Sequence, residues 1–248
     1  MTGVNELAPL ESMGAVLAAW APGRQLPPSL RLVKGQDVLP AALAAGEAWV
    51  EANGGDGLID VLPSLLDEGQ SACVFANLAG ALAAEDSREG RAALRELGEL
   101  LKINDRDGRD LVRSLECLAS RDLLREREEW VGCTAVMIGL SAADGEEVGE
   151  ESKWLEEFAG EAGVLTEARA LLDERGKDDL IEKVEGLGSR QRNFLMANLM
   201  VLMFVDGKWS GEEQALLDEC CEKLRVMSWE AEGQLKAIHT MFNLSVFG

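Results

Sequence analysis

The amino-acid sequence predicts an all-α protein, a compact bundle built from duplicated helical hairpins with an N-terminal helical extension. The chain of 248 residues has no Tyr and six Phe, whereas Ala, Leu and Glu, which favour helices, are abundant. Few segments alternate apolar and polar residues as half-buried strands do. Two long apolar segments, each followed by an acidic turn, instead recur at a fixed spacing. With 47% hydrophobic residues, the chain can bury a sizeable core.

Residues 1–70 are predicted to form the extension. A short helix over residues 13–20 is followed by several Pro and Gly residues, which interrupt regular structure. Residues 39–52 have the pattern of an amphipathic helix, and a short helix over residues 58–66 follows a glycine-rich turn. That turn, residues 53–57, lacks the Lys and Ser or Thr of a phosphate-binding loop. We therefore interpret it as a plain turn and not as a nucleotide site.

Residues 71–127 are predicted to form a degenerate copy of a helical repeat that occurs twice in the C-terminal half. Residues 73–84 supply an apolar helix, and residues 93–103 supply the helix that follows. Between them, residues 85–87 stand where the later copies have an Asp-Gly turn. The paired glutamates of those copies are either replaced by Ala92 and Ala93 or displaced to Glu89. The packing role of the helices is expected to persist, whereas a function of this loop is not.

The two complete copies share one pattern: an apolar helix, Asp-Gly, four residues and Glu-Glu. The members of this pattern are Asp144, Gly145, Glu150 and Glu151 in the first copy and Asp206, Gly207, Glu212 and Glu213 in the second. The copies lie 62 positions apart (206 minus 144). At the same offset, Leu155, Val164 and Thr166 stand opposite Leu217, Val226 and Ser228. The match over many positions predicts that a structural unit was duplicated.

Each complete copy is predicted to contain three helices. The first is the apolar segment, residues 133–143 or 194–205, which we expect to be buried on most sides. The second shows core spacing of its apolar residues: Trp154, Leu155, Phe158 and Ala162 in one copy, and Leu216, Leu217, Cys220 and Leu224 in the other. The third begins at a capping residue, Thr166 or Ser228. We interpret the two copies as one domain over residues 128–248.

In these residues the chain resembles the TerB-like family, which is named for tellurite-resistance proteins. The resemblance covers residues 128–242, because family members are all-helical and carry a duplicated signature of an apolar helix, Asp-Gly, a spacer and Glu. It implies a non-catalytic stress-response or adaptor domain of bacteria, with acidic surfaces that bind divalent cations or partner proteins. The first copy departs from the family pattern, since Glu147 and Val148 replace an apolar residue and a capping residue, whereas the second copy keeps both as Trp209 and Ser210.

Six carboxylates of the duplicated pattern are the candidate metal ligands: Asp144, Glu150, Glu151, Asp206, Glu212 and Glu213. Carboxylate oxygens suit Ca²⁺ or Mg²⁺, but each loop offers fewer ligands than a complete calcium-binding loop, so we expect a weak site with bound water. The favoured alternative is structural, because acids in the first turn of a helix stabilise its free N–H groups and its dipole. Ser210 and Glu213 also have the spacing of a capping box, which by itself explains Glu213.

The charge of the chain is strongly acidic, with 45 Asp and Glu against 24 Lys and Arg and a net charge of −21. This balance disfavours binding to nucleic acid and predicts a protein partner with a basic surface. Residues 88–127 are nearly neutral, with ten Lys or Arg and nine acids. We interpret them as a solvated helix surface with ion pairs; docking of an acidic partner is the alternative.

The remaining features exclude several classes of protein. The five cysteines form no Cys-x-x-Cys pair and lie within apolar helical patterns, which predicts reduced thiols and a cytoplasmic location. The sequence shows no secretory signal and no apolar run long enough to span a membrane. With one His, His239, and no nucleophile motif, we predict no enzymatic activity. The alternatives to a binding or adaptor module are a purely structural scaffold and, third, a carboxylate-metal hydrolase.

Overall fold

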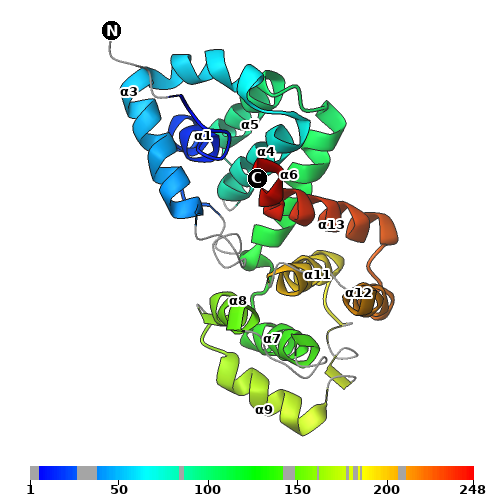
Figure 1. The fold of residues 1–248 in the computed structure, drawn as a ribbon. Coiled ribbons are helices and arrows are strands. Elements are labelled where there is room, and N and C mark those ends of the chain that lie inside the picture. The colour runs from blue at the N-terminus through cyan, green and yellow to red at the C-terminus, as the bar shows by residue number, and fades with distance from the viewer. Residues whose placement is uncertain are drawn as a thin grey trace. The chain divides into compact units, whose positions relative to one another are not determined.

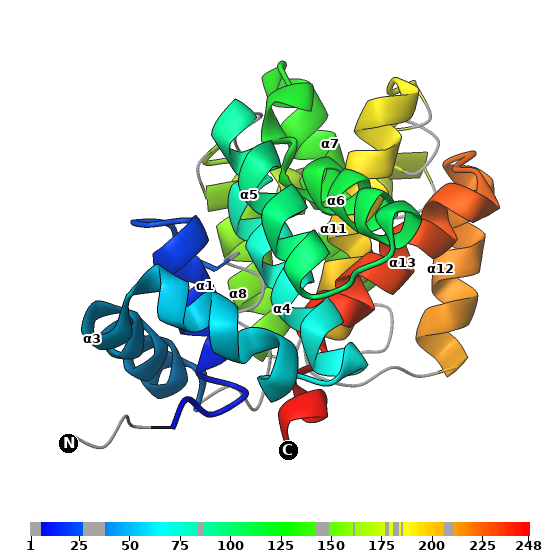
Figure 2. The same ribbon diagram turned by 90° about the horizontal axis from the view of Figure 1, so that it is seen from above.

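The computed structural model describes residues 6–26, 38–83, 87–141, 149–160, 162–176, 179–180, 184, 186–205 and 211–248. These residues contain helices and no strand, which confirms the predicted all-α class (Figure 1; Figure 2, which is turned by 90°). The α-helices are α1 (Ser12–Trp20), α3 (Leu39–Leu65), α4 (Glu68–Leu82), α5 (Arg88–Leu100), α6 (Asp105–Ala119), α7 (Arg127–Ser141), α8 (Gly149–Gly160), α9 (Leu165–Arg175), α11 (Ser189–Phe204), α12 (Gly211–Lys223) and α13 (Ser228–Phe242), with short 3₁₀ helices η1 (Arg121–Leu123) and η3 (Leu244–Phe247).

The described residues fall into two compact units. Unit 1 contains those of residues 1–27, 35–116 and 239–248, and unit 2 contains those of residues 117–238. Among the described residues, the chain passes between the units after Glu116 and after Ile238. The first of these positions lies within α6 and the second within α13. The predicted division of the chain at residues 70 and 127 stays a prediction.

In unit 1, α1 packs closely against the first half of α3. A Cβ atom on Gly14 would overlap the carbonyl oxygen of Leu43, and a Cβ atom on Gly46 would overlap that of Glu11. Only glycine permits this backbone contact. The element α3 covers both helices that the sequence predicts for residues 39–66, and its backbone leaves helical geometry at Gly54, with φ of 77°. The predicted interruption is therefore confirmed.

Helix α4 forms the centre of unit 1. The apolar residues of its middle two turns are buried, as predicted for an apolar helix. Its first turn is held by a capping box, in which Gln70 N donates to Asp67 Oδ1 (2.8 Å) and Asp67 N donates to Gln70 Oε1 (3.1 Å). The ring of Phe75 lies between α5 and α6, where added Cβ atoms on Gly98 and Gly108 would lie 3.3 and 3.6 Å from it. Small residues on both neighbours thus make room for this ring.

In unit 2, α7 and α11 form the core. Every residue of α11 from Phe194 to Met203 is buried, and α7 is buried over most of its length, so the predicted burial of the two apolar segments is confirmed within the described residues. The amide of Asn198, 2% exposed, donates to the carbonyl of Phe194 in its own helix (2.8 Å). A polar residue within this apolar helix is thereby tolerated.

The helix bounds follow the offset of the sequence pattern. Helices α7 and α11 begin at residues 127 and 189, and α8 and α12 at residues 149 and 211, a difference of 62 in each case. We call three sets of consecutive helices triads: α4–α6, α7–α9 and α11–α13. Between the second and third helices of each triad lies a residue with a positive φ: Lys102 (55°), Gly163 (61°) and Arg225 (51°). These positions are 61 and 62 residues apart (163 minus 102 and 225 minus 163). The duplication itself stays a prediction, which these coincidences support.

Candidate functional site

The predicted metal ligands lie at two corners, between α7 and α8 and between α11 and α12. Asp144 and Asp206 lie outside the described residues. Glu150, Glu212 and Glu213 belong to the first turns of α8 and α12, but their side chains also lie outside the description. The structure therefore places one predicted ligand side chain, that of Glu151, and does not show whether the six come together.

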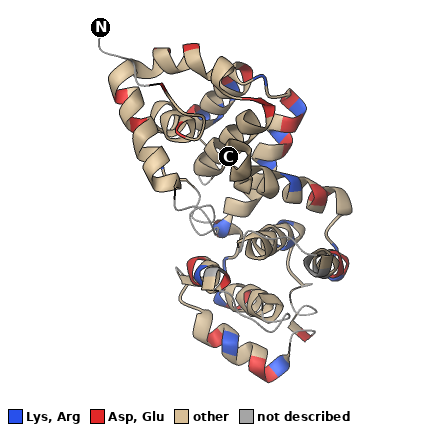
Figure 3. Cartoon of the chain, in the orientation of Figure 1, with Lys and Arg blue, Asp and Glu red and all other residues tan. Residues whose placement is uncertain are grey.

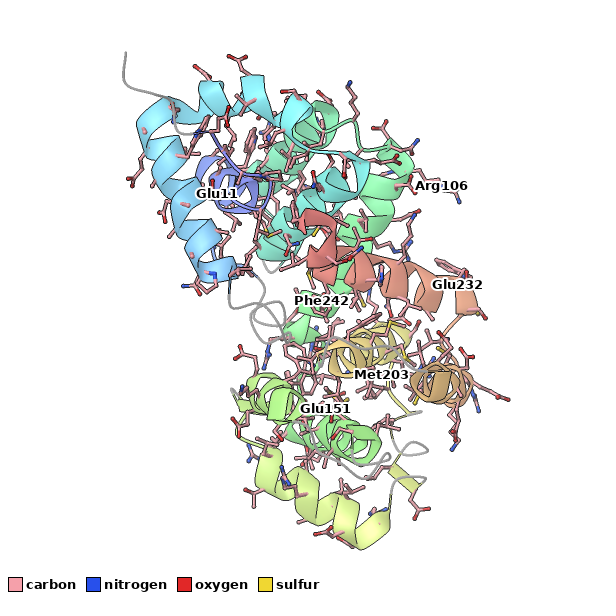
Figure 4. All side chains as sticks on the ribbon, in the orientation of Figure 1. Glu11, Arg106, Glu151, Met203, Glu232 and Phe242 are labelled. Atoms are coloured by element: carbon pink, nitrogen blue, oxygen red, sulfur yellow. The ribbon has the colours of Figure 1, made fainter. Side chains whose placement is uncertain are left out.

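Glu151 occupies the first turn of α8 and is buried, with 9% of its surface exposed (Figure 4). Burial of a carboxylate is costly unless opposite charge or hydrogen-bond donors compensate it. The N-terminal end of α8 contributes such compensation, because its free N–H groups and the helix dipole favour a negative charge. The position suits a helix-capping carboxylate, and it also suits a ligand to a cation bound at the corner.

Helix α8 is held to α11 one turn after Glu151. Trp154 is buried, and its indole Nε1 donates to the backbone carbonyl of Asn198 (3.2 Å). Because Glu151 and Trp154 are three residues apart, both lie on the same side of α8. The first acidic corner is thus built on a helix whose position is fixed by the core.

The opposite end of α8 is held by an arginine from η1. Arg121 Nη2 donates to the carbonyl of Phe158 (2.6 Å), and Nη1 donates to that of Glu157 (3.4 Å). Its guanidinium lies 5.1 Å from the ring centroid of Trp130, a cation–π distance. The arginine therefore satisfies carbonyls that have no partner within the helix and carries the charge that the C-terminal dipole favours.

A second arginine closes the connection between α8 and α9. Arg127 donates to the carbonyls of Ala162 (3.1 Å) and Gly163 (3.3 Å) and forms a bidentate pair with Glu167 (2.6 and 3.2 Å). Both charged side chains are about half exposed, at 53% each. The hydrogen bond with Arg127 lowers the pKa of Glu167 and raises that of Arg127. The sequence interpretation of this region as solvated surface missed both arginine contacts.

Three aromatic rings join α8 to the core, and the carboxylate of Glu129 joins α7 to α11. The ring centroids of Trp130, Phe158 and Phe194 lie 5.3 to 6.3 Å apart, which joins α7, α8 and α11. Glu129 accepts hydrogen bonds from Gln191 Nε2 (2.8 Å) and from two backbone N–H groups at the start of α7. Partial desolvation raises the pKa of Glu129, but these bonds outweigh it and lower the pKa below its usual range.

Two of the cysteines, Cys73 and Cys133, are buried thiols. Burial raises the pKa of Cys73 to about 12 and also raises that of Cys133, so both thiols stay protonated at neutral pH. His239 is exposed on α13. Across the part of the chain that the structure describes, no three His, Cys, Asp or Glu side chains are grouped closely enough to hold a metal ion. No described helix is both long enough and apolar enough to cross a membrane.

Comparisons with protein-family models, with curated proteins and with solved structures find no match to this chain. The resemblance of residues 128–242 to the TerB-like family rests on the duplicated motif and stays a prediction. The local geometry around Glu151 is thus the structural basis for any proposal about function.

Proposed function

We propose that this chain is a non-catalytic, acidic helical binding module, an adaptor of the bacterial stress-response kind that the TerB-like resemblance implies. Its binding sites are the two corners that precede α8 and α12. Each corner binds a divalent cation weakly or presents carboxylates to a basic protein surface. The observation that carries the proposal is the buried carboxylate of Glu151 at a corner where the sequence adds further acids.

The charge distribution supports a basic partner. Residues 35–87 contain nine Asp or Glu and no Lys or Arg, and unit 2 carries a large excess of acids as well. Acidic residues, drawn in red, lie along α3, and this helix contains no Lys or Arg (Figure 3). A surface of this kind attracts cationic partners over roughly 10 Å at moderate salt.

The cation site is tested by titrating the protein with Ca²⁺ and, separately, Mg²⁺ while tryptophan fluorescence is recorded. Trp209 lies within the second corner, and Trp154 is one turn from Glu151. We expect a saturable change that Asp206→Asn weakens and that Trp209→Phe reduces in amplitude. The matched control is Asp60→Asn, which removes an exposed carboxylate from α3. A response that Asp206→Asn leaves unchanged contradicts a metal site at that corner.

The partner surface is tested with a fluorescent oligolysine peptide at low and raised salt. Electrostatic binding is expected to weaken as the Debye length falls from roughly 10 Å at 0.1 M to about 3 Å at 1 M salt. Joint replacement of Glu150 and Glu212 by Gln is expected to weaken binding more than replacement of two α3 carboxylates. Capture that ignores both salt and these substitutions contradicts the proposal.

One observation favours the second candidate, a purely structural scaffold. Both ends of α8 are occupied by charges that suit the helix dipole, with Glu151 at the start and Arg121 at the end. A capping role alone would produce this arrangement. Under that alternative, replacement of Glu151 by Gln lowers stability and leaves cation and peptide titrations without a saturable response in either protein.

A further inference from the structure

The last ten residues of the chain belong to unit 1, although the residues before them belong to unit 2. Helix α13 begins at Ser228 in unit 2, and its last residues, with η3, are part of unit 1. Unit 1 is therefore discontinuous in sequence, and its C-terminal piece follows the whole of unit 2. That piece must be held by contacts within unit 1.

Two amide side chains of α4 hold the C-terminal piece. Asn77, fully buried, donates through Nδ2 to the carbonyl of Met241 (2.9 Å) and to that of Cys73 in its own helix (2.9 Å). Gln70 Nε2 donates to the carbonyl of Val246 in η3 (2.9 Å). Met241 is fully buried as well. The two contacts lie seven residues, or about two helical turns, apart on α4.

The carbonyl of Met241 is among the last four carbonyls of α13. Such carbonyls receive no hydrogen bond from an N–H group of their own helix. Asn77, which is buried, donates to this carbonyl, and the thiol of Cys73 is a second, weaker donor to it (3.7 Å). If the end of α13 leaves α4, the amide of Asn77 loses this partner and the buried side chain of Met241 loses its burial against unit 1, which is unfavourable. The end of α13 and the core of unit 1 therefore stabilise each other.

We propose that residues 239–248 act as a clamp that couples the stability of the two units. Because α13 is one helix and helix formation is cooperative, loss of its unit 2 portion weakens the end that Asn77 binds. Unfolding of unit 2 then releases the clamp and destabilises unit 1. In the intact chain both units unfold together, and weakening the clamp separates their transitions.

The test uses two reporter forms of the full chain, one that keeps Trp49 of unit 1 and one that keeps Trp130 of unit 2, with the other tryptophans changed to Phe. Urea unfolding is followed in each form by fluorescence and by far-UV circular dichroism, because the tryptophan changes alter stability and the two transitions must be compared within one protein. We expect the two signals to change together in both reporter forms. In the Asn77→Ala background, the Trp49 signal is expected to change at lower urea than the circular dichroism, and the Trp130 signal at higher urea.

The matched control is Asn198→Ala, because Asn198 is also buried within an apolar helix and its amide donates to the carbonyl of Phe194 in its own helix. This change is expected to lower both transitions together. A milder variant is Gln70→Glu, which keeps an acceptor for the Asp67 N–H and removes the donor to Val246. If the Asn77→Ala protein does not fold, Gln70→Glu replaces it in the same experiment. Transitions that are already separate in the reporter forms, or that stay coincident in both clamp variants, overturn the proposal.

Discussion

The triads α7–α9 and α11–α13 begin their first two helices at the same offset, but they differ at the last corner. In the first triad, Arg127 and Glu167 form an ion pair across the corner, and α9 packs along α7. The positions 62 residues later are Ser189 and Trp229, which cannot form such a pair, and Trp229 is 62% exposed. Helix α13 instead continues into unit 1.

This difference separates the interactions that set where a helix begins from those that set what it packs against. The first two helices of both triads begin at positions that follow the repeated pattern of the sequence. The course of the third helix depends on contacts at helix ends, which the pattern does not contain. In the triad with the Arg127–Glu167 pair, the third helix, α9, packs against the first, α7. In the triad without that pair, the third helix, α13, extends into unit 1.

The largest expected effect comes from Arg121, which holds the end of α8 in the first triad. Arg121→Ala should lower the free energy of unfolding by about 2–3 kcal/mol, because carbonyls lose a charged donor and Trp130 loses a cation–π contact. Urea unfolding measures this change. Arg125→Ala, an exposed arginine of the same connection, is the control. Equal losses in the two variants would show that Arg121 does not distinguish this triad.

A smaller effect is expected from the tryptophans. Trp154→Phe keeps most of the buried ring but removes the hydrogen bond to the Asn198 carbonyl, so we expect a loss of about 1–2 kcal/mol. Trp229→Phe, at an exposed position of the second triad, should change stability by less than about 0.5 kcal/mol. Thermal unfolding of both variants provides the comparison. A large loss at Trp229 would mean that the corner of the second triad is also closed.

The residues of positive φ should respond with opposite signs. Gly163→Ala forces an alanine to adopt the left-handed conformation and should cost about 1 kcal/mol. In Arg225→Gly, glycine adopts the left-handed conformation without strain, which should stabilise the folded state by up to about 1 kcal/mol. The greater conformational entropy of glycine in the unfolded chain reduces this gain. Chemical denaturation resolves these values. The same sign for both changes would contradict the equivalence of the two turns.

The smallest effect concerns the Arg127–Glu167 pair, which is half exposed. The pKa of Glu167 is lowered in the folded state, so its contribution is present above the ordinary carboxylate pKa and is lost as pH falls through the lowered value. Glu167→Gln should therefore reduce the melting temperature slightly near neutral pH, and the difference from the unsubstituted chain should vanish in acid once the pH lies below the lowered pKa. A difference that persists in acid would assign the effect to packing.

Much of the fold could be predicted from the sequence, because burial of the apolar segments and the interruption at Gly54 are local properties of the pattern. The contacts of Arg121 could not, since its acceptors lie 36 and 37 residues away and an exposed arginine looks the same whether or not it reaches a carbonyl. The bond from Asn77 to Met241 spans 164 residues. Of the candidate site, the position of Glu151 at the start of α8 was predictable, whereas its burial was not.

The discontinuity of unit 1 has a consequence for biosynthesis. Helices α1 to α6 are synthesised before Met241 and Val246, which complete unit 1. At about 5–20 residues per second, translation from residue 116 to residue 239 takes roughly 6–25 s. During that interval α4 carries an amide and an apolar face with no C-terminal partner. The earlier pieces of unit 1 therefore stay incomplete until residues 239–248 have been synthesised.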